Sequence, residues 1–318
     1  MGVLTITVAI AGCGHPPATT SQGSSTHGLA NVAYAGSLQV LNNQLIGPAF
    51  SKATGNTYRG QGGGSFGMAQ EIRSKTINPN IFESIGYAPI QVIEPQSTKW
   101  ALAFAASPLV VAYSPHSPYA AELNAIKAGR RPLKNLFALM ATPGFHLGRT
   151  NPNTDPQGQA CYMMVELAAK KYGISAQQVS KILGPVDNPH QIYSEEGILT
   201  LLQSGGLDAS SAFLSEALER HLDYIALPSD LNFASPHQSA WYHHASMTLS
   251  NGSRVYGSLL TVDMTTVGKP TPAALSFIHY VLGAQGSRLM RKAGYRVFSP
   301  QWLGQRQAIP ASLQKTLP

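Results

Sequence analysis

The chain has 318 residues, of which 43% are hydrophobic and 12% are charged, a composition typical of a folded protein with an unusually uncharged surface. The length allows one or two domains with a large core, and the composition excludes extensive disorder outside the N-terminal tail. The formal net charge is +7, but the basic residues form no long run with interleaved aromatic residues. We therefore expect no nucleic-acid binding. No stretch is long and apolar enough to predict a transmembrane helix.

Residues 1–30 are predicted to be a lipoprotein signal followed by a flexible tether. Val3 to Ala11 form an apolar core that is too short to span a bilayer. The core ends in Ile10-Ala11-Gly12-Cys13, which resembles the lipobox of bacterial lipoproteins. This resemblance implies that Cys13 becomes the lipidated first residue, with the Pro-, Thr-, Ser- and Gly-rich residues 14–28 as the tether. The alternative is a frayed terminus with a chance cysteine.

A strand, a tight turn and a helix are predicted over Val32 to Phe50. A short apolar run breaks at Gly36-Ser37, and apolar residues then follow at a helical spacing as far as Phe50. Ser37 is expected at the N-cap of this helix, where backbone N–H groups lack partners and the helix dipole is positive. Such a place binds small anions, although Ser37 could also serve only as a cap.

A second glycine-rich turn, Tyr58 to Gly67, leads into a helix-like segment with Ser65 as a second possible cap. Two such helix starts could direct their N–H groups at one point and form an oxyanion cradle from neutral donors. The same residues offer another interpretation, because Gly63 to Gly67 fit the G-x-S-x-G nucleophile elbow of α/β-hydrolases. The Asp and His residues available for a triad with Ser65 are Asp155, Asp208, His221 and His243.

A third loop, Gly148 to Gly158, precedes a helix predicted over Ala160 to Tyr172. Asp155 followed by Pro156 is the pattern of a helix start, with Asp as the cap and Pro in the first position. The functional interpretation is a third helix N-terminus that faces the same cleft from another lobe. Cys161, within this helix, is expected to be a buried small hydrophobe.

The other segments predict a scaffold. Phe104 to Tyr113 are expected to form a long buried strand that passes from one lobe to another. Asn251-Gly252 indicates a hairpin, Leu259 to Met264 a second crossing strand, and Thr271 to Ala293 a helix. The adjacent pair His243-His244 does not predict a metal site, because neighbouring residues do not share one face of a helix or strand.

The Ala35-Gly36-Ser37 turn, the turn ending in Ser65, the run Ser107 to Tyr113 and above all the loop Gly148 to Pro156 resemble the molybdate/tungstate-binding proteins of ABC importers, in particular the tungstate-type branch. The resemblance covers about Asn31 to Ser299. It implies an α/β type II periplasmic-binding-protein fold, in which two crossing strands join two lobes around a ligand cleft. Residues 31–106 and 259–318 would form lobe 1, and residues 107–258 would form lobe 2.

By position in the motifs, the resemblance implies ligand contacts from Gly36, Ser37, Gly64, Ser65, Asn151 and Asp155. It implies no catalytic step, no cofactor and no metal other than the one within the oxyanion. The partner would be an ABC permease, reached by a monomer that is lipid-anchored on the extracytoplasmic face. One departure is that the branch has a Glu in a short F-E-Y run, where this chain reads Ser211-Ala212-Phe213.

The carboxylate of Asp155 bears on the choice of ligand. Beside a dianion it is repulsive unless it turns away as a cap, bonds the metal or accepts a proton from the ligand. Hydrogen phosphate carries such a proton, whereas molybdate, tungstate and sulfate do not at neutral pH. Phosphate or sulfate is therefore the alternative ligand within the same fold.

Overall fold

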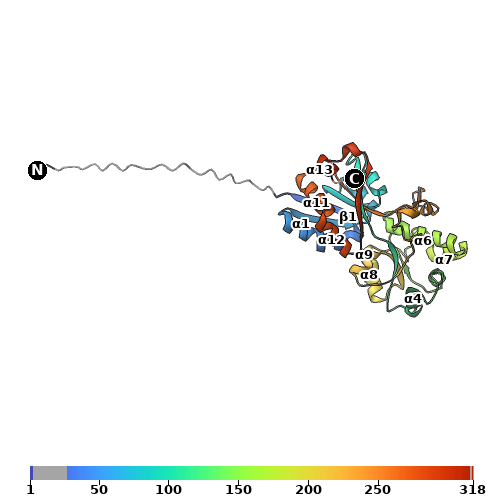
Figure 1. Cartoon of the computed structure of the whole chain (residues 1–318). Helices are drawn as coiled ribbons and strands as arrows, with labels where there is room; N and C mark the ends of the chain where they lie inside the picture. Colours follow the sequence, from blue (N-terminus) through green and yellow to red (C-terminus); the bar gives the residue numbers. More distant parts are fainter. Residues whose placement is uncertain (3–26, 316, 318) are drawn as a thin grey trace.

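A computed structural model describes residues 1–2, 27–315 and 317 of the chain. Cys13 and most of the predicted lipoprotein segment lie outside these residues. The described chain contains two main sheets, each covered by helices, and we call these units lobe 1 and lobe 2. Figure 1 shows the first and last segments, blue and red, together in lobe 1, and the green and yellow segments in lobe 2.

Lobe 1 contains a six-stranded sheet in the order β12-β4-β11-β3-β1-β2. Its strands are β1 (Leu29–Ala35), β2 (Thr57–Gly63), β3 (Ile81–Ile85), β4 (Trp100–Ala106), β11 (Thr261–Thr266) and β12 (Arg296–Gly304). Strands β2, β1 and β3 are parallel, whereas β11 and β12 pair antiparallel with β4. The polar, glycine-containing β2 lies at an edge, while β3 and β4 are buried along their whole length.

The helical segments that follow the strands of lobe 1 cover its sheet. They are η1 (Gly36–Leu38), η2 (Leu41–Ile46), α1 (Gly47–Thr54), α2 (Ser65–Arg73), α3 (Ala88–Ile93), α11 (Pro272–Leu282), α12 (Ala284–Lys292), η4 (Arg306–Ala308) and α13 (Ala311–Gln314). Phe50 of α1 packs edge-on against Phe277 of α11, with their ring centroids 5.2 Å apart. This contact joins an early and a late helix of the lobe in one core.

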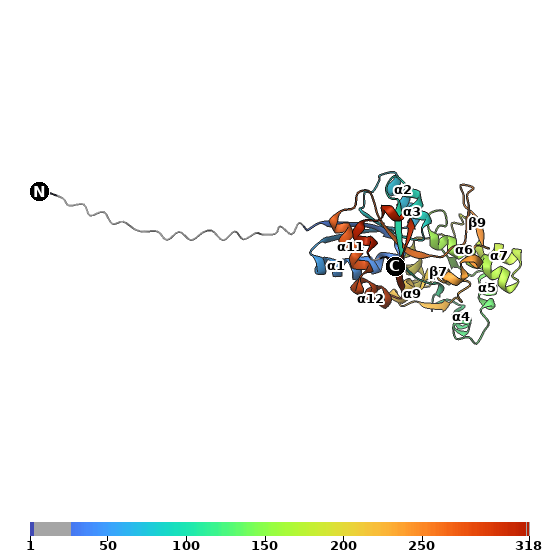
Figure 2. The same ribbon diagram turned by 45° about the horizontal axis from the view of Figure 1, so that its top comes forward.

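Lobe 2 contains a four-stranded sheet in the order β6-β7-β5-β8. Its strands are β5 (Leu109–Tyr113), β6 (Leu147–Gly148), β7 (Ala209–Phe213) and β8 (Asp223–Ala226). Its helices are α4 (Ala120–Lys127), α5 (Lys134–Met140), α6 (Pro156–Tyr172), α7 (Ala176–Leu183), α8 (Glu195–Ser204), α9 (Leu214–Glu219), η3 (Pro236–Gln238) and α10 (Ser239–Tyr242). A hairpin of β9 (Ser246–Thr248) and β10 (Arg254–Tyr256) lies beside α6 (Figure 2).

Three local predictions are wrong in detail. Phe104 to Tyr113 form two strands, because the chain breaks at Ser107-Pro108 and enters the second sheet as β5. Thr271 to Ala293 form two helices, because Gly283 is extended between them (ψ 176°). Gly286 lets the second helix approach the end of the first, since a Cβ there would lie 2.4 Å from the Val281 carbonyl oxygen.

The third error concerns the helix caps. Ala35 is the N-cap of η1 and Ser37 lies inside this turn, while Gly64 is the N-cap of α2 and Ser65 is its first residue. Neither helix start has a side-chain cap. The sequence pattern alone cannot distinguish the cap position from the residue beside it.

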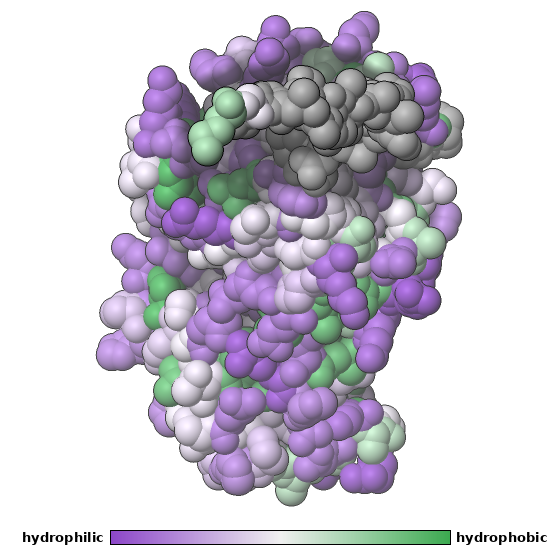
Figure 3. All heavy atoms as spheres, turned by 90° about the vertical axis from the view of Figure 1, so that its left-hand side faces the viewer, coloured by the Kyte–Doolittle hydropathy of each residue, from purple (hydrophilic) through white to green (hydrophobic). Residues whose placement is uncertain are grey.

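The lobe 1 face in Figure 3 is dominated by hydrophilic and neutral residues, with hydrophobic ones in small groups outside the area that grey atoms cover. In the described residues, no helix combines the length and the apolar character needed to cross a membrane.

Candidate functional site

A cavity of about 440 Å³ lies where the glycine turns of lobe 1 meet two loops of lobe 2. It is lined by Gly36, Gln39, Gly62, Gly63, Gly64, Thr150, Asn151, Thr154, Asp155, Ile192, Tyr193, Ser194, Glu195 and Glu196. Four of the six predicted ligand residues, Gly36, Gly64, Asn151 and Asp155, therefore border one space. Among the described residues, no lysine or arginine lines it.

Ser37 lies beside this cavity with an unused hydroxyl group. The residue is 4% exposed, and its Oγ has no hydrogen-bond partner within the described residues. Its carbonyl oxygen accepts a hydrogen bond from the Tyr295 hydroxyl at 3.1 Å, which holds the turn against lobe 1. An unpartnered buried hydroxyl costs free energy unless something occupies it. Ser37 is therefore available to a ligand.

Ser65 has a different environment. Its side chain is 1% exposed, and its Oγ accepts a hydrogen bond from the Ile85 backbone N–H at 3.1 Å. The backbone N–H groups of Phe66 and Gly67 donate to the Thr154 carbonyl oxygen of lobe 2 at 3.0 and 3.2 Å. The start of α2 therefore joins the two lobes directly, and the Ser65 hydroxyl ties the helix to β3.

Gly64 is required by this close approach of the lobes. A Cβ at this position would lie 2.7 Å from the Thr154 carbonyl oxygen and 3.2 Å from Asp155 Oδ2. Any larger side chain would push lobe 2 away. The glycines of the second turn thus allow the loop that precedes α6 to reach lobe 1.

Asp155 is the N-cap of α6, with Pro156 in the first helical position, as predicted. Its Oδ1 accepts a hydrogen bond from the Gln157 N–H at 2.7 Å, and the residue is 6% exposed. Burial raises the pKa of Asp155 to about 6, against the opposing effect of the hydrogen bond from the Gln157 backbone N–H. Asn151 Oδ1 accepts from the Asn153 backbone N–H at 3.0 Å, which fixes the loop at the cavity.

Three further carboxyl groups of lobe 2 lie at or beside this cavity, those of Glu195, Glu196 and Glu216, and no sequence pattern predicted a role for them. Glu195 is the first residue of α8 and lines the cavity. Glu216, in α9, is 4% exposed and accepts hydrogen bonds from the Phe213 N–H and from Gln157 Nε2, both at 2.6 Å. Burial raises the pKa of Glu216 to about 8. The acidic first turn of α8 was visible in the sequence, but its proximity to Asp155 was not.

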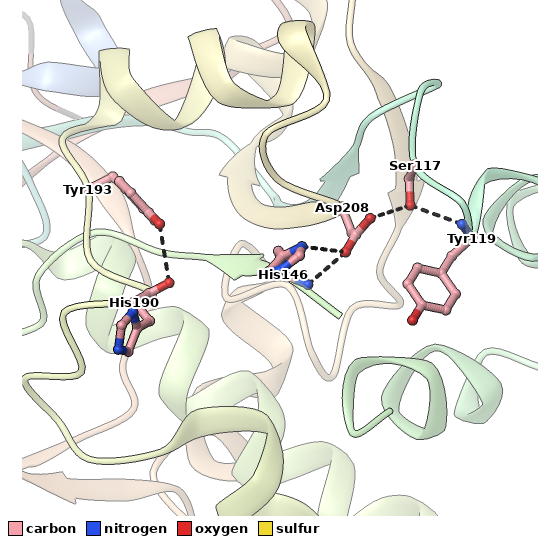
Figure 4. A network of polar contacts seen from close by, with 6 residues as sticks. All are labelled: Ser117, Tyr119, His146, His190, Tyr193 and Asp208. Carbon is pink, nitrogen blue, oxygen red and sulfur yellow. Dashed lines mark hydrogen bonds and ion pairs between the residues drawn. The ribbon is translucent and has the colours of Figure 1, made fainter. Parts of the chain in front are cut away.

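The structure separates the residues of the alternative hydrolase triad. Asp208 accepts hydrogen bonds from Ser117 Oγ at 2.6 Å and from the His146 backbone N–H at 2.7 Å (Figure 4). His243 stacks on Tyr256, with ring centroids 4.7 Å apart. In the described part of the chain, neither His221 nor His243 forms a hydrogen bond with Ser65. The Ser65 hydroxyl therefore lacks the base that a nucleophile needs.

The described residues contain no group of three or more His, Cys, Asp or Glu residues that could hold a metal ion. Cys161 is buried and free within the same part of the chain. The neutral side-chain donors that line the cavity are hydroxyl and amide groups, which suit an oxygen-rich ligand.

The chain was compared with known proteins. Residues 30–296 match the family model of the bacterial extracellular solute-binding proteins. A solute-binding protein of Petrotoga mobilis is 26% identical over 90% of this chain and 89% of its own length. The molybdate/tungstate-binding protein WtpA of Pyrococcus abyssi is 27% identical over 82% of each chain. The periplasmic molybdate-binding protein of Azotobacter vinelandii superposes with a TM-score of 0.56 at 16% identity, over 83% of this chain and 97% of that one.

The two lobes and the cleft between them define a binding protein of the periplasmic type, so the predicted α/β fold class is confirmed. The chain belongs to the family of bacterial extracellular solute-binding proteins. The predicted resemblance to molybdate/tungstate-binding proteins is also confirmed, because such proteins are among its relatives. Members of this family work outside the cytoplasm as solute-binding proteins.

Proposed function

We propose that this protein captures a tetrahedral oxyanion, molybdate or tungstate, in the cavity between its lobes and delivers it to an ABC permease. The observation that carries the proposal is the unpartnered Ser37 hydroxyl beside a cavity bordered by Gly36, Gly64, Asn151 and Asp155. Neutral donors and helix N-termini from both lobes can stabilise a dianion without a cationic side chain. The named ligands of the relatives support the choice of anion.

The remaining features of the proposal concern the whole chain. Residues 31–106 with 259–318, and residues 107–258, would move as two lobes that close over the anion and exclude water. Cys13 would carry the lipid anchor on the extracytoplasmic face, and the protein would act as a monomer without a catalytic step. The sheets support this division, because their strands come from Leu29–Ala106 and Thr261–Gly304 in lobe 1 and from Leu109–Ala226 in lobe 2.

Calorimetric titration of the purified protein with molybdate, tungstate, sulfate and phosphate tests the proposed ligand. We expect tight binding of molybdate or tungstate at one site, with much weaker binding of the other two anions. Binding of phosphate or sulfate alone would keep the fold and change the ligand. Failure to bind all four anions would contradict the proposal.

A further inference from the structure

Glu195 carries a carboxyl group from lobe 2 onto the serine turn of lobe 1. A Cβ built on Gly36 would lie 1.6 Å from Glu195 Oε2, so this oxygen occupies the space that any side chain at position 36 would take. The residue is partly buried, and its carboxyl group makes no hydrogen bond or ion pair with any described residue. Glu195 thus reaches the cleft as an unpartnered polar group.

The Ser37 hydroxyl lies on the other side of the same space. A small second cavity is lined by Gly36, Ser37, Gln39, Val40, Glu195, Glu196, Leu199, Glu216, Glu219 and Arg220. Ser37 Oγ, which is buried and has no partner in the described residues, and the partly buried Glu195 carboxyl therefore border one space from opposite lobes.

The charges around Glu195 oppose its ionised form. The titratable or charged groups that face it are Asp155 of α6, Glu216 and Glu219 of α9, Glu196 of α8, Arg220 and Tyr295. Arg220 is the one cation among these groups; its Nη2 pairs with Glu196 Oε2 at 2.6 Å, and its charge lowers the pKa of Glu219. Burial first, and then the charges of Asp155, Glu216 and Glu196, raise the pKa of Glu195 well above that of a free glutamic acid.

We propose that Glu195 belongs to the anion site and that capture of a dianion takes up one proton on its carboxyl group, which then donates a hydrogen bond to the anion. This inference rests on the proposed function. In an open cleft, water would surround the carboxylate and keep it ionised. Closure removes this water and brings the carboxyl group beside other acids and a dianion, so the protonated form is favoured.

The sign of the pH dependence follows from linkage. A group that binds its proton more tightly in the complex than in the free protein makes binding stronger at low pH. This gain in affinity is lost as the pH rises through the pKa that the group has in the complex. For uptake of one proton, the dissociation constant should rise by up to about tenfold per pH unit above neutrality.

The experiment is calorimetric titration of the full chain with molybdate, which takes up no proton itself near neutral pH. Titrations in Tris and in HEPES at about pH 7.5 should give different apparent enthalpies, equivalent to uptake of up to about one proton per anion. Glu195→Gln supplies a neutral amide donor of nearly the same shape. We expect this variant to bind molybdate without proton uptake, and to bind more tightly than the wild type at about pH 8.

The control is Glu122→Gln, which makes the same change on α4 of lobe 2, beside Arg131 and away from the cleft. It should keep the wild-type proton uptake. Equal enthalpies of the wild type in both buffers, or an unchanged pH dependence in Glu195→Gln, would overturn the inference and leave the proposed function standing. If the wild type binds none of the four anions, the proposed function fails, and the inference fails with it.

Discussion

At the scale of single residues, the two predicted serines of the cleft have different surroundings. The Ser37 hydroxyl has no partner in the described residues, whereas the Ser65 hydroxyl accepts a hydrogen bond from Ile85. A hydroxyl without a protein partner is the one that a ligand can use at no cost to the fold. The two serines should therefore respond differently to the same substitution.

Ser37→Ala should weaken molybdate binding by about tenfold and leave the thermal stability unchanged or slightly higher, because no protein hydrogen bond is lost. Ser65→Ala should lower the free energy of unfolding by about 1 kcal/mol, because the buried Ile85 N–H loses its acceptor. Titration calorimetry and thermal unfolding measure the two effects. A stability loss in Ser37→Ala that equals the loss in Ser65→Ala would contradict this assignment.

Glu83 is a second buried acid, placed in the centre of the lobe 1 sheet. It is 2% exposed, and its Oε2 accepts a hydrogen bond from Asn42 Nδ2 at 2.5 Å. Burial raises the pKa of Glu83 to about 7, against the opposing effect of this hydrogen bond. The folded protein therefore holds a proton here that the unfolded chain releases at lower pH.

Glu83→Gln should make the protein more stable than the wild type at about pH 8, by up to about 3 kcal/mol. The raised pKa stabilises the wild type at low pH, and this contribution is lost as the pH rises from about 4.5 through about 7. The amide keeps the contact with Asn42 and does not ionise. Urea unfolding across this pH range measures the difference, with Glu71→Gln on α2 as the control. If the free energy of unfolding of Glu83→Gln changes with pH as it does in the wild type, Glu83 is not the source of this pH dependence.

At the scale of the element, α6 depends on the side chain that begins it. Asp155 accepts the Gln157 N–H, Pro156 starts the first turn, and Gly173 ends the helix in the left-handed region at φ 68°. A Cβ on Gly158 would lie 2.4 Å from the Thr150 carbonyl oxygen, so the first turn of α6 packs directly on the loop that contains Thr150 and lines the cavity. The start of α6 thus fixes both the helix and the position of the loop that borders the cavity.

Asp155→Ala should lower the free energy of unfolding by about 1 kcal/mol, because the cap of α6 is lost. Asp155→Asn should be at least as stable as the wild type at neutral pH, because its side-chain oxygen can still accept the Gln157 N–H and it carries no buried charge. Thermal unfolding at neutral pH compares the two variants. Equal destabilisation by both would mean that the carboxyl group supports the helix by something other than the cap.

At the scale of the whole molecule, contacts at the start of α2 hold the lobes together. The Thr154 carbonyl oxygen accepts hydrogen bonds from Phe66 and Gly67, and a Cβ on Gly67 would lie 3.9 Å from the Thr154 Cβ. These bonds join the two lobes at Thr154, which lines the cavity. They can form only when the lobes are closed.

The double variant Gly67→Cys/Thr154→Cys should form a disulfide between the lobes, because the separation lies within the usual range of about 3.5–4.5 Å. In a chain with Cys13→Ser, the oxidised variant prepared without anion should not bind molybdate, and reduction should restore binding. Calorimetry with and without reductant makes the comparison, and each single cysteine variant is its control. Full binding by the oxidised form would show that the anion enters without opening of the lobes.

The sequence by itself determined the features that depend on neighbouring residues. The Asp155-Pro156 helix start, the Asn251-Gly252 hairpin and the buried Cys161 all follow from local hydrogen bonding or periodicity. The fold class also followed, because the resemblance covers most of the chain. These features need only the geometry of a few consecutive residues or a pattern over the whole sequence.

Only the tertiary structure decided which of the predicted groups face the cavity. Ser65 turns its hydroxyl to Ile85, and Glu195 reaches Gly36 from the other lobe. Both placements depend on how strands and helices far apart in the sequence pack together, and no local pattern encodes such a distance. The raised pKa values of the carboxyl groups at the cleft arise in the same way, because burial and the proximity of other acids set the proton affinity of a carboxyl group.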